Sequence, residues 1–140
     1  DWRALVPDGY EMLPATAELL SSGLRGAEAI EGRGFWSMED FLQRGFALRL
    51  VHEGQIVCRC TADMVLEDKT EVGIYTHEAY RGRGFATATA AAAVEHCLQR
   101  GIGHIGWHCW SPNVASRRTA EKVGFELVLD HHGLELWLGE

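Results

Sequence analysis

The sequence lacks the features that mark membrane-embedded and secreted proteins. No run approaches the roughly 20 apolar residues that a membrane-spanning helix needs, and the chain does not open with a signal-peptide pattern. It also has no CxxC pair, because its four cysteines stand at positions 58, 60, 97 and 109. These spacings, even with His108 added, match no standard zinc site. We therefore expect reduced thiols, no metal and a cytoplasmic protein.

Positive charge is scarce. The chain has 13 Lys and Arg against 20 Asp and Glu, which gives a formal net charge of −7. A general nucleic-acid binder needs a broad basic face, so this class of protein is disfavoured. Basic residues that do cluster are more informative against this acidic background.

The chain also has no internal repeat and no low-complexity linker. Its 140 residues fit one domain, and a domain of this size hides about two thirds of its unfolded surface. The first residue is Asp1 rather than Met. We therefore expect residues 1–140 to form one domain that is a processed form or a fragment of a longer protein.

Apolar periodicity, helix caps and turn residues predict one α/β domain with a mixed sheet. Ser37 and Asn113 are good helix caps, and Glu53-Gly54 is placed as the turn of a hairpin. Helices are predicted at 15–22, 38–42, 85–100 and 114–123. Strands are predicted at 10–13, 46–52, 55–66, 71–76 and 104–110, followed by a final hairpin over 125–138 that turns near position 132.

The longest predicted helix directly follows the densest basic, glycine-rich stretch, YRGRGFATA at 80–88. In this helix, one face carries Ala90, Val94, Cys97 and Leu98. A strand, a glycine-rich turn and a helix N-terminus together suit an anion, because the N–H groups of the first turn lack helical partners and the helix dipole adds positive potential. A sharp turn with solvated arginines is the alternative.

Two nucleotide-binding motifs are missing from this stretch. A Walker phosphate loop needs a lysine after its glycines, and none follows Gly84. A dinucleotide fingerprint needs a third glycine, where Thr87 stands, and an acidic residue about 20 positions later. The next acidic residues are Glu95 and Glu121, so both nucleotide interpretations are weak.

Arg81, Gly84 and Ala86 form the pattern R-x-x-G-x-A. The surrounding IYTHEAYRGRGFATATAAAAVEHC resembles the acyl-CoA-binding motif of the GNAT superfamily of N-acetyltransferases. NVASRRTAEKVGF resembles that family's Asn-containing helix, which ends in a Lys-x-Gly-Phe turn. Together with EDFLQRGF, these stretches are similar to the zwittermicin A resistance-type branch, whose members have a longer N-terminal part. This chain corresponds to their C-terminal, CoA-binding portion.

The resemblance implies a single GNAT-like domain with a mixed, mostly antiparallel sheet that is splayed at the CoA cleft and flanked by helices. It implies acetyl-CoA as the cofactor, a loop and helix N-terminus around the pyrophosphate, and main-chain groups of one strand along the pantetheine arm. The expected cofactor-binding residues are Ile74, Tyr75, Thr76, Arg81, Gly82, Arg83, Gly84, Phe85, Ala86, Thr87, Asn113 and Ser116.

The catalytic residues are less clear. Many family members carry a Tyr two residues before the Lys of their Lys-x-Gly-Phe turn, and here Ala120 stands in its place. The thiolate would then leave without help or with help from another group. Glu71, on the strand that enters the cleft, and His108, on the opposite strand, are the candidate bases. A solvated glutamate and a hydrogen-bonded histidine are the structural alternatives.

Phe35, Trp36 and Trp107 are the candidates for contact with the acceptor. The first two lie where the family forms its acceptor site, and Trp107 is expected in the cleft wall. Glu39 and Asp40 nearby suit a cationic amine. The leading hypothesis is acetyl transfer to a small-molecule amine by direct attack in a ternary complex. A non-catalytic acyl-CoA-binding or sensor module, or half of a larger enzyme, is the alternative, and a homodimer is left open.

Overall fold

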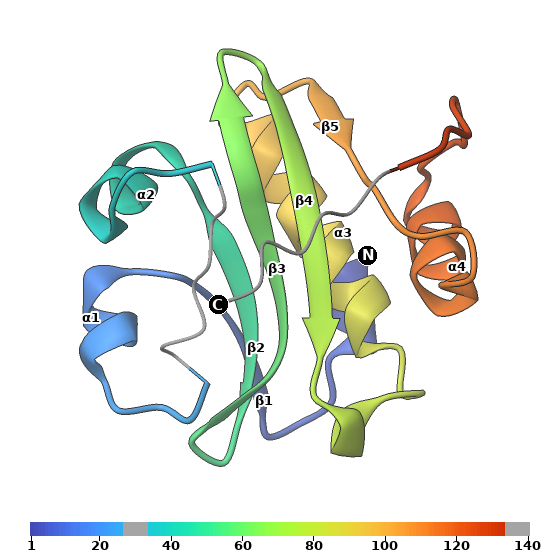
Figure 1. Cartoon of the computed structure of the whole chain (residues 1–140). Coiled ribbons are helices and arrows are strands. Elements are labelled where there is room, and N and C mark those ends of the chain that lie inside the picture. Colours follow the sequence, from blue (N-terminus) through green and yellow to red (C-terminus); the bar gives the residue numbers. More distant parts are fainter. Residues whose placement is uncertain (27–33, 134–140) are drawn as a thin grey trace, which may run out of the picture.

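A five-stranded sheet forms the centre of the fold. The computed structural model describes residues 1–26 and 34–133, and its strands lie in the order β1-β2-β3-β4-β5 (Figure 1). The strands are β1 (Tyr10–Pro14), β2 (Ala47–His52), β3 (Gln55–Leu66), β4 (Lys69–Thr76) and β5 (His104–Gly106). The first four pair antiparallel, and β5 pairs parallel to β4. The sheet is therefore mixed and mostly antiparallel, as predicted.

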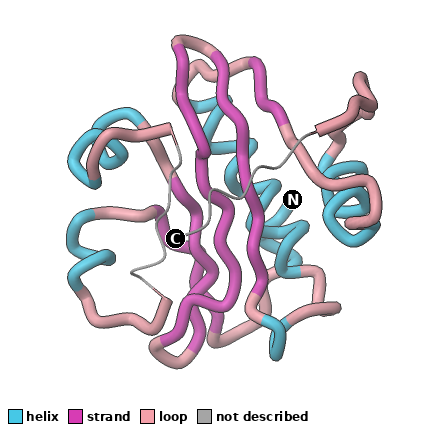
Figure 2. The backbone as a smooth tube through the Cα atoms, in the orientation of Figure 1, coloured by secondary structure: helices cyan, strands magenta, loops and turns pink. Residues whose placement is uncertain are grey.

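Helices lie behind this sheet and beside its two edges (Figure 2). They are the 3₁₀ turns η1 (Trp2–Leu5) and η2 (Glu78–Tyr80) and the helices α1 (Ala17–Ser21), α2 (Met38–Arg44), α3 (Phe85–Gln99) and α4 (Val114–Val123). Figure 1 shows α3 behind the sheet, α1 and α2 beside β1 and β2, and α4 beyond β5. The predicted caps are confirmed, because the side chains of Ser37 and Asn113 accept bonds from the first turns of α2 and α4. No described helix combines the length and the apolar content that a membrane span requires.

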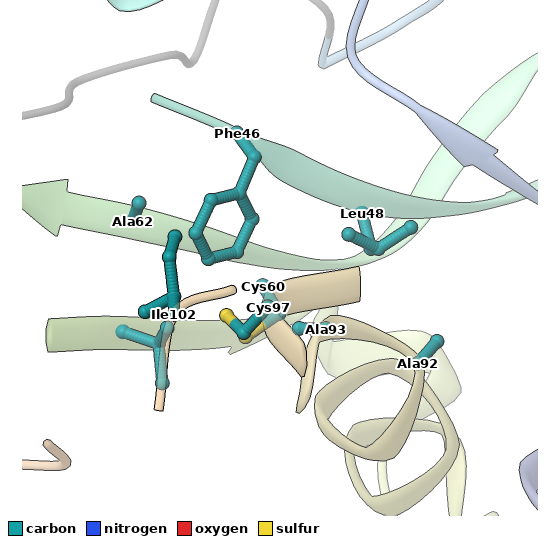
Figure 3. Close-up of a cluster of buried hydrophobic side chains, with 9 residues drawn as sticks. Phe46, Leu48, Cys60, Ala62, Ala92, Ala93, Cys97 and Ile102 are labelled. Carbon is teal, nitrogen blue, oxygen red and sulfur yellow. The ribbon is translucent and has the colours of Figure 1, made fainter. Parts of the chain in front are cut away.

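The main core lies between α3 and the sheet. Small side chains on α3, Ala92 and Ala93, let the helix approach β2 and β3, where Phe46 and Leu48 fill the remaining space (Figure 3). Cys97 meets Cys60 of β3 in the same cluster. Burial raises the pKa of both thiols, so these cysteines act as small apolar residues.

The two faces of the sheet differ in chemistry, because side chains alternate along each strand. On β4, Val72 and Ile74 belong to the core against α3. The residues between them, Glu71, Gly73 and Tyr75, therefore lie on the opposite face. Arg49 of β2 and Arg59 of β3 lie on this opposite face as well, because they are in register with Tyr75.

Three predictions need correction. Leu98 is 61% exposed, because it sits past the edge of the buried face of α3. The strand predicted at 104–110 ends at Gly106, because only its first three residues pair with β4. The first arm of the predicted final hairpin is not a strand over 125–133, since no described segment pairs with it. The second arm, at 134–138, lies outside the described residues.

Candidate active site

A cleft opens where β4 and β5 separate. The two strands pair from Lys69 with His104 to Glu71 with Gly106. Beyond this point β4 continues to Thr76, whereas the chain after Gly106 leaves the sheet toward α4 (Figure 1). A cavity of about 690 Å³ lies between β4, the loop before α3 and α4. The splayed sheet that the resemblance implied is therefore present.

All predicted cofactor residues except Arg83 line this cleft. The Arg83 side chain instead bonds the Ala79 carbonyl at 3.3 Å and lies over the Tyr80 ring. Arg81 braces the same loop by donating from Nε to the Thr76 carbonyl at 3.1 Å. The arginines therefore hold the loop in shape, while the loop backbone faces the cleft.

The start of α3 has the geometry that suits an anion. Gly84 is the N-cap residue with φ of 81°, and its helix start has no side-chain cap. The first helical bond runs from Ala88 N–H to the Gly84 carbonyl, so the N–H groups before Ala88 have no acceptor within the helix. A side chain at Gly84 would meet nothing within 4 Å, which leaves space for a ligand against the backbone.

One wall of the cleft, a cationic face of α4, was not predicted from the sequence. Ala115, Arg118, Thr119 and Lys122 all line the cavity. Their spacing of three, four and seven residues places them on one helical face, so the signal was present in the sequence. Arg118 and Lys122 add two positive charges close to the start of α3.

Asn113 both caps α4 and lines the cleft. Its Oδ1 accepts the Ser116 N–H at 3.2 Å and starts α4, and both residues line the cleft. The Ser116 hydroxyl in turn accepts a bond of 3.0 Å from the Trp107 indole. The cap and the ligand-facing interpretations of Asn113 are therefore compatible.

The two candidate bases contact each other. His108 Nδ1 lies 2.7 Å from Glu71 Oε2, although the residues are far apart in sequence. Gly106 permits this contact, because a Cβ atom there would meet the Glu71 side chain at 3.0 Å. Both side chains remain partly exposed. When Nδ1 carries the proton and donates to the carboxylate, Nε2 keeps a lone pair and can accept another proton.

This Glu71–His108 pair stands at the closed end of the splay, since Glu71 is the last β4 residue that pairs with β5. It lines a second cavity of about 650 Å³ together with Trp107 and Ala120. Different faces of α4 line this cavity and the cleft, and neither Glu71 nor His108 lines the cleft itself. Ala120 brings no hydroxyl group to either.

Phe35 and Trp36 line neither cavity. Phe35 packs edge-on against Phe41 with ring centroids 5.1 Å apart, and Trp36 is 95% exposed. The carboxylate of Asp40 accepts the Trp36 N–H and binds Arg44. The Arg44 side chain holds the pKa of Asp40 at about 2. The acceptor roles of Phe35 and Trp36 stay predictions.

The sequence model of the GNAT acetyltransferase family matches residues 2–133 of this chain. A similar curated protein is the uncharacterized N-acetyltransferase YdfB of Bacillus subtilis (strain 168). It is 33% identical over 98 residues, which make up 69% of this chain and 37% of YdfB.

Solved structures show the same fold. A GCN5-related N-acetyltransferase-like protein from Streptococcus suis 89/1591 matches with a TM-score of 0.75 and 28% identity, over 91% of this chain and 52% of that one. The aminoglycoside N-acetyltransferase AAC(6')-Iy in complex with CoA matches with a TM-score of 0.66 and 16% identity, over 91% and 94% of the two chains. The chain thus spans about a third to a half of the length of YdfB and the Streptococcus suis protein. The predicted fold class is confirmed.

Proposed function

Because the chain belongs to the GNAT acetyltransferase family, we propose that it transfers the acetyl group of acetyl-CoA to the amine of a small molecule by direct attack in a ternary complex. The observation that carries the proposal is the cleft at the splay, where the cofactor residues expected from the sequence meet. GNAT acetyltransferases use acetyl-CoA, and AAC(6')-Iy is a structural neighbour seen with CoA. Membership of the zwittermicin A resistance-type branch stays a prediction.

The residues of the cleft fit the cofactor. The open backbone at Gly84 and the unpartnered first turn of α3 suit a pyrophosphate. Arg118 and Lys122 supply the charge that phosphates require. The pantetheine arm would lie along Ile74–Thr76, whose main chain borders the same cavity. Bound there, acetyl-CoA supplies an activated acetyl group to the closed end of the splay.

The Glu71–His108 pair would move the proton. His108 Nε2 takes a proton from the attacking amine, and the Glu71 carboxylate stabilises the resulting imidazolium through Nδ1–H. The amine nitrogen forms its bond to the acetyl carbon as the C–S bond breaks, and the sulfur keeps the electron pair. Since Ala120 has no proton to give, the thiolate takes one from solvent, which the low pKa of a thiol makes feasible.

Binding of the cofactor is the first test. Acetyl-CoA at 100 times its dissociation constant should add about 2.7 kcal/mol of apparent stability, visible as a higher melting temperature. A well-folded sample whose melting temperature does not change at millimolar acetyl-CoA would contradict the proposal. Binding without release of free CoA across a panel of amines would instead favour a non-catalytic acyl-CoA-binding module, which the missing hydroxyl at Ala120 makes the second candidate.

The proton step has its own test. Glu71→Gln and His108→Ala should each keep acetyl-CoA affinity and lower turnover by about 10²–10⁴. The double variant should be little worse than either single one, because the two residues act as a unit. His104→Ala is the matched control, since this exposed histidine on β5 contacts Asp68 at 3.5 Å and lines neither cavity. Full activity in both single variants would remove the pair from the mechanism.

A further inference from the structure

A guanidinium group lies buried and without a partner in the middle of the sheet. Arg49 of β2 is 0% exposed. None of its three side-chain nitrogens has a hydrogen-bond partner within the described residues. Burial, and then the neighbouring Arg59 charge, lower the pKa of Arg49 to about 10. An uncompensated buried charge is costly to folding, so an anion that reaches it would be held strongly.

A second guanidinium stands beside it. Arg59 of β3 is the register partner of Arg49 on β2 and of Tyr75 on β4. Its guanidinium lies 4.5 Å from the centroid of the Tyr75 ring. No carboxylate within 1–26 and 34–133 forms an ion pair with either arginine. We call these two residues the arginine pair.

The arginine pair is placed beside the cleft. Figure 1 shows β2, β3 and β4 side by side with α3 behind them, and Arg59 shares the opposite face with Tyr75, which lines the cleft. Glu71 lies on the same face of β4, four residues from Tyr75. At about 3.3 Å per residue, roughly 13 Å separate their Cα atoms. The arginine pair and Glu71 therefore share one face of the sheet, and Tyr75, next to Arg59, lies about the length of a small molecule from Glu71.

We propose that the arginine pair binds a carboxylate of the acceptor, so that the acceptor is an amino acid or a related compound with an amine at one end and an acid at the other; this inference rests on the proposed acetyl transfer. Arg59, which is half-buried, makes the contact. Arg49 supplies a second charge from the neighbouring strand on the same face, where it is buried and water does not screen it. The planar fork of a guanidinium matches a carboxylate in shape as well as charge.

Matched acceptors test the proposal. The rate of acetyl transfer is measured for 4-aminobutyrate and 6-aminohexanoate and for their uncharged carboxamides. The acids should be preferred in kcat/KM by about 10–100-fold, the range that one hydrogen-bonded charge contributes. Arg59→Met should bring this ratio close to one. Arg25→Met removes the same charge from an exposed position and should keep the ratio.

Arg49→Met provides a second, independent readout. Replacing an unpaired buried charge by an apolar side chain of similar length should raise the melting temperature, while the preference for acids falls. A lower melting temperature with an unchanged preference would show that Arg49 serves the fold alone and would overturn the proposal. Equal rates for acids and carboxamides in the parent protein would do the same.

A binding experiment separates this proposal from acetyl transfer itself. With CoA present, 6-acetamidohexanoate should raise the melting temperature of the parent protein, and 6-acetamidohexanamide should not. Arg59→Met should abolish the difference. If the parent protein shows this difference in melting temperature but acetylates no amine, the carboxylate site is supported and the proposed acetyl transfer is contradicted. If the protein acetylates amines but shows no such difference, the carboxylate site is contradicted and the proposed acetyl transfer is supported.

Discussion

Replacing Gly84 by valine tests the mouth of the cleft, and Gly101 provides its control. The two glycines lie at opposite ends of α3 with nearly the same backbone angle, φ of 81° at Gly84 and 77° at Gly101. A Cβ atom would meet nothing within 4 Å at either position. Only Gly84 lines the cleft. The two valine variants therefore share the backbone strain and differ in what the new side chain faces.

The strain can be estimated for both variants. A non-glycine residue in the left-handed region costs about 1–2 kcal/mol, and a β-branched one lies at the upper end. For a chain of 140 residues, about 4 °C of melting temperature corresponds to each kcal/mol. Both Gly84→Val and Gly101→Val should therefore melt about 4–8 °C below the parent protein.

Binding should separate the two variants. A valine at Gly84 occupies the space that the pyrophosphate needs and displaces it from the backbone donors. Loss of two hydrogen bonds to a charged group removes about 3–6 kcal/mol, or about 10²–10⁴-fold in affinity. Isothermal titration with CoA, at a temperature where both variants are folded, measures this directly. Dissociation constants within threefold of each other would show that the loop is a turn and nothing more.

Three further predictions concern the frame around the site. Asp40 has a folded pKa of about 2, below its ordinary 3.8. Its contribution to stability is therefore present above pH 3.8 and is lost as the pH falls toward 2. In Asp40→Asn, the urea concentration at the unfolding midpoint should change less with pH over that range than it does in the parent protein. Asn113→Ala removes the cap that accepts the Ser116 N–H and should lower the free energy of unfolding by about 1 kcal/mol, with weaker CoA binding only if the side chain also faces the ligand. Leu50→Ala, at a fully buried core position, should cost about 2–5 kcal/mol in chemical denaturation.

Local features of the chain could be predicted from the sequence. The N-caps Ser37 and Asn113, the Glu53-Gly54 turn and the glycine loop before α3 all follow from residues within a few positions of one another. A helix N-terminus presents N–H groups without helical partners wherever it is packed. Most residues that line the cleft could therefore be predicted from the sequence, and their contact with a cofactor stays a prediction.

Contacts between distant segments could not be predicted from the sequence. Glu71 and His108 looked like rival bases, and only the parallel pairing of β4 with β5, with Gly106 opposite Glu71, brings them to 2.7 Å. The apolar pattern of 104–110 predicted a longer strand and did not show that the pairing with β4 ends at Gly106.

The burial of Arg49 is the clearest case. The alternating pattern of β2 identifies Leu48 and Leu50 as core residues, but it assigns Arg49 only to the other face, which in a mixed sheet can meet either water or protein. The register of the three strands determines the surroundings of Arg49, because it places Arg49 beside Arg59 and Arg59 beside Tyr75. By itself the sequence predicted the glycine loop and helix start where we propose that a cofactor phosphate binds, since that segment is made of neighbouring backbone groups. The tertiary structure alone decided that His108 meets Glu71 and that Arg49 lies beside Arg59, because these residues come from different segments and meet only when the sheet is formed.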